Sequence, residues 1–162
     1  WAGEELGLLG STHYVGSLSD ADREALIAYI NADMLASPNG FASIDDDGHD
    51  KGDGAALADL LQVQVERAGG SSITGAGGGS DHAPFERAGV TVGGVNSGAT
   101  EILTPEQASA SGSKAGLPAD ACYHQACDDR SNTRLELARI LTTAIGETVR
   151  AVADGGAIPG AK

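Results

Sequence analysis

Residues 25–34 (ALIAYINADM) are apolar on both alternating faces, and the SPNG turn at residues 37–40 follows them closely. This pattern is typical of a strand buried between two helical layers. Along the rest of the chain, Gly, Pro, Asn and Asp separate short units that alternate between helix-like and strand-like patterns. The sequence therefore predicts an α/β fold, and it places the carboxylate of Asp33 at a strand end.

The other predicted elements alternate in the same way. Ser19 begins a turn with Asp22 three residues later, a weak capping box. The last helix is expected to have Asn132 as its cap and Gly155 as its stop. We expect helices at 6–18, 53–68 and 133–154, short strands at 41–44, 71–74 and 90–95, and one helical turn at 104–107. The predicted buried stripe of the last helix is Leu135, Ala138, Leu141, Ile145, Val149 and Val152.

Length and charge limit the classes of protein. With 162 residues the chain has the size of one domain, predicted at residues 1–156 with a tail at 157–162. No apolar run approaches the roughly 18 residues that cross a bilayer. The net charge of −13 should repel phosphate backbones and anionic lipid headgroups. We therefore expect neither nucleic acid nor a membrane as a partner.

The two cysteines, Cys122 and Cys127, flank the tetrapeptide YHQA. This spacing suits either a small disulfide loop or a pair of metal thiolates. Zinc sites built on thiolates usually add histidine at closer spacing, so the disulfide is favoured. A disulfide indicates an exported, extracellular protein.

Residue types suited to metal binding or acid–base chemistry occur at four turns: Glu4-Glu5, Asp33, Asp81-His82 and Tyr123-His124. Adjacent glutamates on a non-helical backbone point in different directions. One can then bind a cation while the other takes a proton from water. A solvated helix start would also explain the two glutamates, so the pair alone is weak evidence.

The combination of motifs is more specific. The segments are WAGEELGLLGS at 1–11, NADM at 31–34 with SPN at 37–39, SDHAPF at 80–85 and CYHQACD at 122–128. In order and spacing they resemble the co-catalytic zinc aminopeptidases of the M28 peptidase family, and most of all the secreted bacterial leucine-type enzymes. The resemblance implies the C-terminal part of a three-layer αβα zinc exopeptidase domain, of the phosphorylase/hydrolase-like fold, with a mixed, mostly parallel sheet. It implies that the fold's N-terminal strands are absent from this chain.

The family's site residues can be carried over where the motifs match. The resemblance implies hydrolysis of N-terminal, apolar residues from peptides through a zinc-activated water, with Glu4 as the proton shuttle. Glu5 and His124 would bind one zinc ion, and Asp33 would bind a second. Tyr123 would donate a hydrogen bond to the developing oxyanion, a role that suits a phenol.

The same resemblance predicts the substrate pocket. Met34, Gly79, Asn96 and Tyr123 would border it, together with the loop from 122 to 127. Gly79 stands where close relatives often have Arg, and Asn96 stands where they often have an aromatic residue. These departures predict a roomier or more polar pocket and make a preference for leucine insecure.

Part of the family's metal site has no counterpart here. The bridging carboxylate and the other histidine of the family precede the Glu4-Glu5 turn, so the chain holds three of five expected ligand residues. His13, in a helix, and His49, in an acidic loop, are predicted to be surface residues rather than substitutes. We expect the missing segment to belong to the same gene product, and the 162 residues alone to be poorly active.

Three further features have simpler interpretations. Residues 45–50 (DDDGHD) resemble a calcium loop but lack its terminal glutamate, so a solvated turn is favoured and calcium is left open. The glycine-rich segment at 75–79 has no Lys-Ser/Thr, which argues against a phosphate loop and for a pocket wall. Asp81 and His82 are expected to support the metal ligands rather than to bind metal.

Two other functions remain open. One is acyl transfer by a related single-zinc glutaminyl cyclase, and the other is a non-catalytic peptide-binding or receptor module of the same fold. Retention of Glu4, Glu5, Asp33, Tyr123 and His124 together argues against the second, since a binding module has no physical need for that set.

Overall fold

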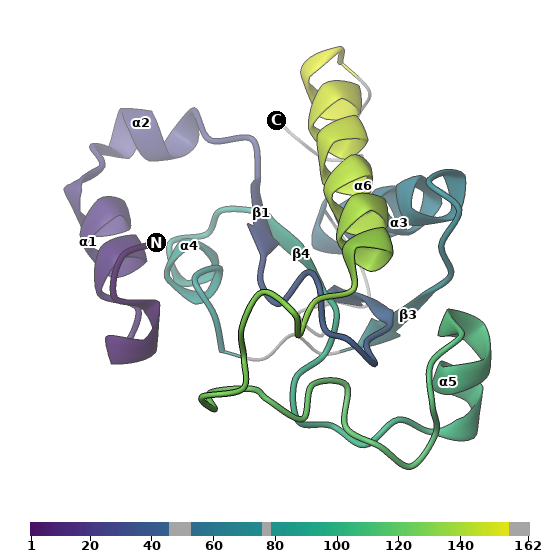
Figure 1. Ribbon diagram of the computed structural model, residues 1–162. Helices are drawn as coiled ribbons and strands as arrows, with labels where there is room; N and C mark the ends of the chain where they lie inside the picture. The colour runs from purple at the N-terminus through teal and green to yellow at the C-terminus, as the bar shows by residue number, and fades with distance from the viewer. Residues whose placement is uncertain (46–52, 76–78, 156–162) are drawn as a thin grey trace.

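A computed structural model describes residues 1–45, 53–75 and 79–155. Its centre is a four-stranded sheet with the order β1-β4-β2-β3 (Figure 1). The strands are β1 (Tyr29–Ala32), β2 (Ala42–Asp45), β3 (Ser72–Gly75) and β4 (Val92–Asn96). β1 pairs parallel with β4, β2 pairs parallel with β3, and β2 pairs antiparallel with β4. The predicted mixed, mostly parallel sheet is confirmed.

Helices cover both faces of this sheet. They are the 3-10 helix Glu4–Leu6, α1 (Leu9–Ser17), α2 (Asp20–Glu24), α3 (Asp53–Arg67), α4 (Ala83–Arg87), α5 (Pro105–Ser111) and α6 (Leu135–Ala153). Val92 and Val95 stand an odd number of positions apart in β4, so their side chains point to opposite faces. Val95 packs in the cluster built with α3 and α6, whereas Val92 packs with α1 and α4. The three-layer αβα architecture is confirmed.

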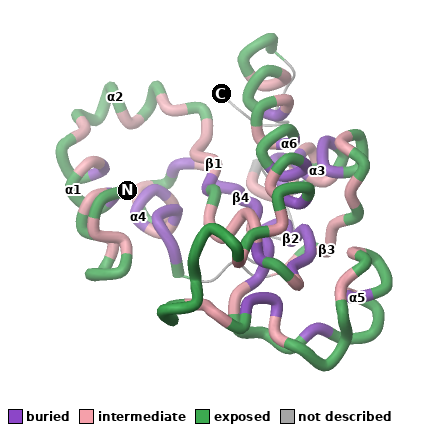
Figure 2. Tube along the Cα trace, viewed as in Figure 1, coloured by how far each residue is buried: buried purple, intermediate pink, exposed green. Residues whose placement is uncertain are grey.

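The main core lies between the sheet and the α3–α6 pair. Leu57, Leu61 and Val65 of α3 are fully buried, in agreement with the predicted apolar face of that helix. An added Cβ on Gly93 would lie 2.9 Å from Leu57 Cδ2, so the glycine lets α3 approach β4 closely. Figure 2 shows that burial concentrates in β2, β4, α3 and α4. In the described ranges, no helix is both long enough and apolar enough to cross a bilayer.

The long buried strand predicted at 25–34 is wrong in its first half. Only Tyr29–Ala32 pairs with a neighbour, and Ala25 instead caps α2. Ile27 is 55% exposed. Among the described strands β1 has a partner on one side only, and none of them pairs with the residues before Tyr29. The predicted strand end is correct, because Asp33 directly follows β1.

The start of α6 also differs from the prediction. Arg134 is the N-cap and no side chain caps it, while the Asn132 amide donates to Asp120 and Asp128 instead. Leu135 is 75% exposed and Val149 is 52% exposed, so neither belongs to the buried stripe. Because α6 packs against α3, the buried face of α6 is the one next to the predicted stripe. That buried face is Leu137, Ile140, Leu141, Ala144 and Thr148.

Local capping was predicted more accurately. The Ser19 hydroxyl accepts from Asp22 N at the start of α2. Thr104 and Gln107 form a reciprocal capping box, and the helix that they begin, α5, extends beyond the single predicted turn. His13 is exposed on α1, as expected. His49 and the tail at 157–162 lie outside the described residues.

Candidate active site

Glu4 and Glu5 begin the 3-10 helix that precedes α1. The predicted non-helical backbone is therefore wrong. Successive side chains of a 3-10 helix are about 120° apart around its axis, so the two carboxylates still diverge. Gly3 precedes this turn with φ of 71° and Gly7 follows it with φ of 98°. Glycine adopts this left-handed backbone without the steric cost of a Cβ, which explains the sharp turn at the site.

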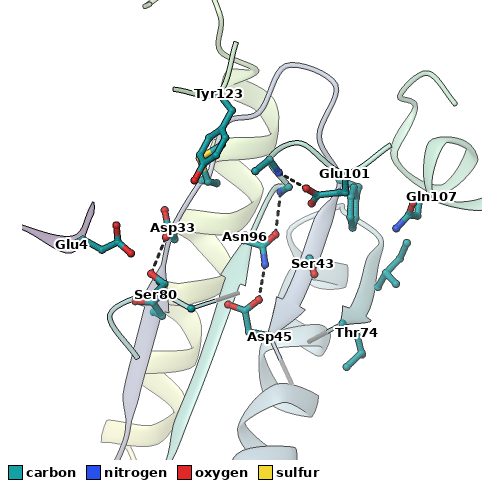
Figure 3. A pocket seen from close by; sticks show the side chains of 18 of the residues that line it. Glu4, Asp33, Ser43, Asp45, Thr74, Ser80, Asn96, Glu101, Gln107 and Tyr123 are labelled. Carbon is teal, nitrogen blue, oxygen red and sulfur yellow. Dashed lines mark hydrogen bonds between the residues drawn. The ribbon is translucent and has the colours of Figure 1, made fainter. Parts of the chain in front are cut away.

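Asp33 is held by a chain of hydrogen bonds from the sheet and the 80–82 loop. Ser80 Oγ donates to Asp33 Oδ2 at 2.8 Å, and Asn31 Nδ2 donates to Ser80 Oγ at 3.0 Å. Tyr29 OH in turn donates to Asn31 Oδ1 at 3.1 Å. Figure 3 shows the Ser80–Asp33 contact. Sequence reasoning missed Ser80 and Asn31, although both belong to the quoted motifs.

Asp81 and His82 are buried beside this network. Asp81 Oδ1 accepts from Ser11 Oγ at 2.5 Å, which ties the 80–82 loop to α1. His82 is the N-cap residue of α4. Neither residue lines the pocket described below, in keeping with a supporting position, and their effect on metal binding stays a prediction.

The second half of the site is a loop closed by the Cys122–Cys127 disulfide, with Cα atoms 5.4 Å apart. The predicted pairing is confirmed. Asp120, which is buried, accepts from Cys122 N at 2.8 Å and from Asn132 Nδ2 at 2.9 Å. A covalent closure and a buried carboxylate thus fix the loop that carries the catalytic candidates.

Tyr123 and His124 lie on this loop with their rings stacked, 3.9 Å between centroids. His124 Nε2 lies 2.6 Å from Glu5 Oε1, although the two residues are 119 positions apart. Imidazole nitrogen and carboxylate oxygen are both ordinary zinc donors. Two donors on one tetrahedral zinc are roughly 3.4 Å apart, so this pair would separate by less than about 1 Å to hold the ion. The donor set therefore fits the predicted zinc.

Asp33 does not join this pair in a closer cluster. In the part of the chain that the structure describes, no group of three or more His, Cys, Asp or Glu residues is close enough to share an ion. The predicted assignment already placed Asp33 on a different zinc from Glu5 and His124. The described residues thus supply one donor pair and one separate carboxylate.

A cavity of about 660 Å³ connects these residues. Figure 3 shows Glu4, Asp33 and Tyr123 around one part of it. Seven predicted site residues line the cavity: Glu4, Glu5, Asp33, Met34, Gly79, Asn96 and Tyr123. His124 lies next to the cavity through its contact with Glu5. One pocket therefore joins the predicted catalytic residues to the predicted substrate-binding residues.

Negative charge accumulates at this pocket. Burial raises the pKa of Glu4, and the charges of Asp33, Glu5 and Asp81 raise it further. The pKa of Tyr123 is also raised, first by burial and then by Glu5, Asp33 and Glu4. The phenol of Tyr123 therefore stays protonated and can donate a hydrogen bond.

The backbone is strained at the pocket. Among the described residues, the non-glycine positions with positive φ are Leu8, Met34 and His124, all at or next to the site. Such a conformation costs about 1–2 kcal/mol per residue. Ser97 N donates to Met34 O at 2.6 Å, and Ser37 N donates to Ser97 Oγ at 2.9 Å. These bonds attach the strained turn after β1 to the end of β4.

Asp45 also lines the pocket, although the sequence predicted a solvated turn for this residue. Asp45 ends β2, is buried, and accepts from Asn96 Nδ2 at 2.5 Å. The rest of the calcium-like segment, residues 46–50, lies outside the described residues. Of the glycine-rich segment, Gly75 and Gly79 line the pocket, and residues 76–78 are likewise not described.

Known proteins are similar to this chain in sequence. The leupeptin-inactivating enzyme 1 of Streptomyces exfoliatus is 39% identical over 137 residues, which cover 82% of this chain and 29% of that protein. An aminopeptidase of Pseudomonas aeruginosa is 38% identical over 155 residues, which cover 90% of this chain and 28% of that protein. The chain thus spans less than a third of the length of these relatives.

Solved structures agree on the fold. A zinc aminopeptidase from Bacillus subtilis matches with a TM-score of 0.66 at 24% identity, over 88% of this chain and 33% of that one. A glutaminyl cyclase from an Acidobacteriales bacterium matches with a TM-score of 0.67 at 22% identity, over 92% and 47% of the two chains. At this identity the structures show the fold alone.

The family itself is shown by sequence. The profile of Peptidase family M28 matches residues 1–149, which include both halves of the candidate site. The matched range contains the motifs at Glu4-Glu5, Asp33, Asp81-His82 and Tyr123-His124. The chain belongs to peptidase family M28.

Proposed function

We propose that this protein is a zinc-dependent aminopeptidase. The observation that carries the proposal is the contact of Glu5 Oε1 with His124 Nε2, 2.6 Å apart, beside a pocket that Glu4, Asp33 and Tyr123 line. An exposed glutamate–histidine contact adds little to the stability of a fold, whereas a metal site needs both donors side by side. The P. aeruginosa relative, named an aminopeptidase, supports the same activity.

Glu5 and His124 would hold one zinc ion, and Asp33 would contribute to a second. Zinc, when bound, supplies Lewis acidity that polarises a peptide carbonyl and makes water a stronger nucleophile at neutral pH. The hydrogen bond from Ser80 restrains the rotation of the Asp33 carboxylate, and the disulfide closes the loop that carries His124. Fixed ligands lower the reorganisation needed to bind a metal.

Glu4 and Tyr123 carry the proton transfers and the charge stabilisation in this proposal. The Glu4 carboxylate would take a proton from the attacking water and deliver it to the departing amine. The Tyr123 phenol would donate to the carbonyl oxygen as negative charge develops there. Both side chains line the same cavity, so one bound peptide can meet both.

The remaining roles follow from the same arrangement. Met34, Gly79 and Asn96 line the pocket and would contact the side chain of the first residue of the peptide. Asp81 and His82 would support the loop that positions Asp33. The Cys122–Cys127 disulfide favours a secreted protein, because such bonds persist in oxidising compartments.

The test uses the intact protein with aminoacyl anilides. We expect release of the anilide, its loss on treatment with a chelator, and its recovery with added zinc. Glu4→Gln should lower kcat by about a hundredfold or more, while Glu24→Gln, an exposed carboxylate at the end of α2, should not. If Glu4→Gln kept the turnover of the unaltered protein, the assigned proton shuttle would be wrong.

The two other functions give different results in related assays. A glutaminyl cyclase would convert an N-terminal glutamine to a cyclic product with loss of ammonia and would leave the anilides intact. A non-catalytic module would bind peptides without consuming them. The first is a candidate because the Acidobacteriales enzyme shares the fold, but the P. aeruginosa relative, at 38% identity, is named an aminopeptidase.

A further inference from the structure

One wall of the pocket is polar and acidic although it is separate from the proposed catalytic residues. We call Asp45, Asn96 and Glu101 the acidic wall. Asn96 Nδ2 donates to Asp45 Oδ1 at 2.5 Å, and Asn96 Oδ1 accepts from Gly98 N at 3.0 Å. Glu101 Oε2 accepts from Ala99 N at 2.8 Å. Figure 3 shows Asn96 between Asp45 and Glu101, and all three residues line the cavity.

Two glycines keep this wall open to the cavity. Gly94 lies opposite Asp45 in the β2–β4 register, and an added Cβ there would be 2.6 Å from Asp45 Oδ2. Gly98 has φ of 84°, and an added Cβ there would be 2.6 Å from Glu101 Oε1. The carboxylates of Asp45 and Glu101 thus lie directly against the backbone of Gly94 and Gly98. A residue with a side chain at either glycine position would displace the carboxylate beside it.

The acidic wall is far enough from the catalytic residues to receive a long side chain. Asp33 follows β1, whereas Asp45 ends β2, two strands away in the sheet order. Two strand spacings are roughly 9–10 Å. With bonds of about 1.5 Å, an extended lysine side chain reaches roughly 6 Å beyond its Cα, whereas leucine reaches only roughly 4 Å. A long side chain can cross from the catalytic end toward this wall.

The rest of the lining suits the stem of such a side chain. Met34, Phe41 and Ile73 add apolar surface to the same cavity. Lysine and arginine bury their methylene groups on apolar surface while the charged end remains in a polar environment. None of the described lining residues is Lys, Arg or His. Among these described residues, a basic ligand would therefore meet carboxylates rather than a like charge.

We propose that the pocket selects peptides with a basic N-terminal residue, lysine or arginine, and that Glu101 and Asp45 determine this specificity. The inference rests on the proposed aminopeptidase function and adds its substrate class. A leucine side chain would place methyl groups against the acidic wall and would gain none of the charge-assisted contacts that a cation makes there.

The test compares kcat/KM for lysyl, arginyl and leucyl anilides with the intact protein. We expect the basic substrates to exceed leucine by at least about tenfold. Glu101→Gln keeps the shape of the side chain and should lower the lysine-to-leucine ratio about fivefold, as expected for one partly exposed charge pair. Glu66→Gln, which changes an exposed carboxylate on α3 outside the pocket, is the matched control for net charge.

The outcomes separate this inference from the proposed function. Absence of hydrolysis for every anilide would refute the aminopeptidase proposal itself. Hydrolysis with leucine preferred over both basic residues would overturn only the inference. The inference also fails if Glu101→Gln and Glu66→Gln change the lysine-to-leucine ratio equally, since the effect would then be one of overall charge.

Discussion

Replacing Ser80 by alanine tests whether Asp33 is a metal ligand that the fold orients. The Ser80 hydroxyl is the link between sheet and carboxylate, because it accepts from Asn31 Nδ2 at 3.0 Å and donates to Asp33 Oδ2 at 2.8 Å. Ser80→Ala removes both bonds and little volume. Asp33 would then be free to rotate about its side-chain bonds.

The expected loss of stability in Ser80→Ala follows from how deeply its two hydrogen-bond partners, Asn31 and Asp33, are buried. Asn31 is 4% exposed, so its amide loses an acceptor that water cannot easily replace, at a cost of about 1–3 kcal/mol. Asp33 is partly exposed, so water compensates most of its loss. The free energy of unfolding should therefore fall by about 2 kcal/mol. Loss of a residue that orients a metal ligand typically lowers metal affinity about 10- to 100-fold.

The assay is zinc competition against a chelator of known affinity, together with denaturant unfolding, on the intact protein. Ser17→Ala is the matched control, because Ser17 Oγ bonds to Tyr14 O at the exposed end of α1, away from the pocket. We expect weaker zinc binding for Ser80→Ala and not for Ser17→Ala. Unchanged zinc affinity in a Ser80→Ala variant that is destabilised as calculated would show that Asp33 is not a ligand oriented by Ser80.

Three further changes have defined outcomes. Leu141→Ala should lower the free energy of unfolding by about 2–5 kcal/mol in a denaturant titration, because Leu141 is fully buried between α6 and the main core. Serine at both Cys122 and Cys127 should cost about 2 kcal/mol for so short a loop, which thermal unfolding with and without reductant measures. Gly94→Ala should lower kcat/KM and stability together, because the new methyl group would meet the Asp45 carboxylate at 2.6 Å. Equal stability of the Gly94→Ala and unaltered proteins would contradict the close packing at this position.

Local sequence patterns predicted the elements whose partners are close in the chain. The α3 face with Leu57 and Leu61 follows helical periodicity, and the Thr104–Gln107 capping box involves residues three apart. Asp33 was placed correctly because a turn motif follows it directly. Such features depend on backbone geometry over a few residues.

Sequence patterns failed to predict the structure where a contact with a residue distant in the chain determines it. Residues 25–28 are apolar but do not form a strand, because no described strand pairs with them. Asn132 is a residue type that often caps helices through its Oδ1, yet its Nδ2 donates to the buried carboxylate of Asp120 and to Asp128, and these bonds hold the side chain in the turn before α6. Leu135 is apolar and exposed because the packing of α3 fixes the rotation of α6.

The sequence predicted the reactive groups of the candidate site. It did not predict the groups that hold those reactive groups in position. Motifs supply Glu4, Glu5 and His124, since the chemistry restricts which residue types can serve. Ser80 has no such restriction, because many hydroxyl or amide groups could orient a carboxylate, and only the fold shows which one does.

The strained positions show how the fold compensates for a reactive arrangement. Met34 and His124 both have positive φ, at a cost of about 1–2 kcal/mol each. Each is restrained by neighbouring groups, Met34 by Ser97 of the β4 end and His124 by the disulfide loop anchored on Asp120. Because relaxed loops could satisfy the same hydrogen bonds without strain, the conformation has to be imposed by neighbouring structure. Neighbouring groups thus hold the two segments that carry the pocket lining and the proposed zinc donor, as a preorganised site requires.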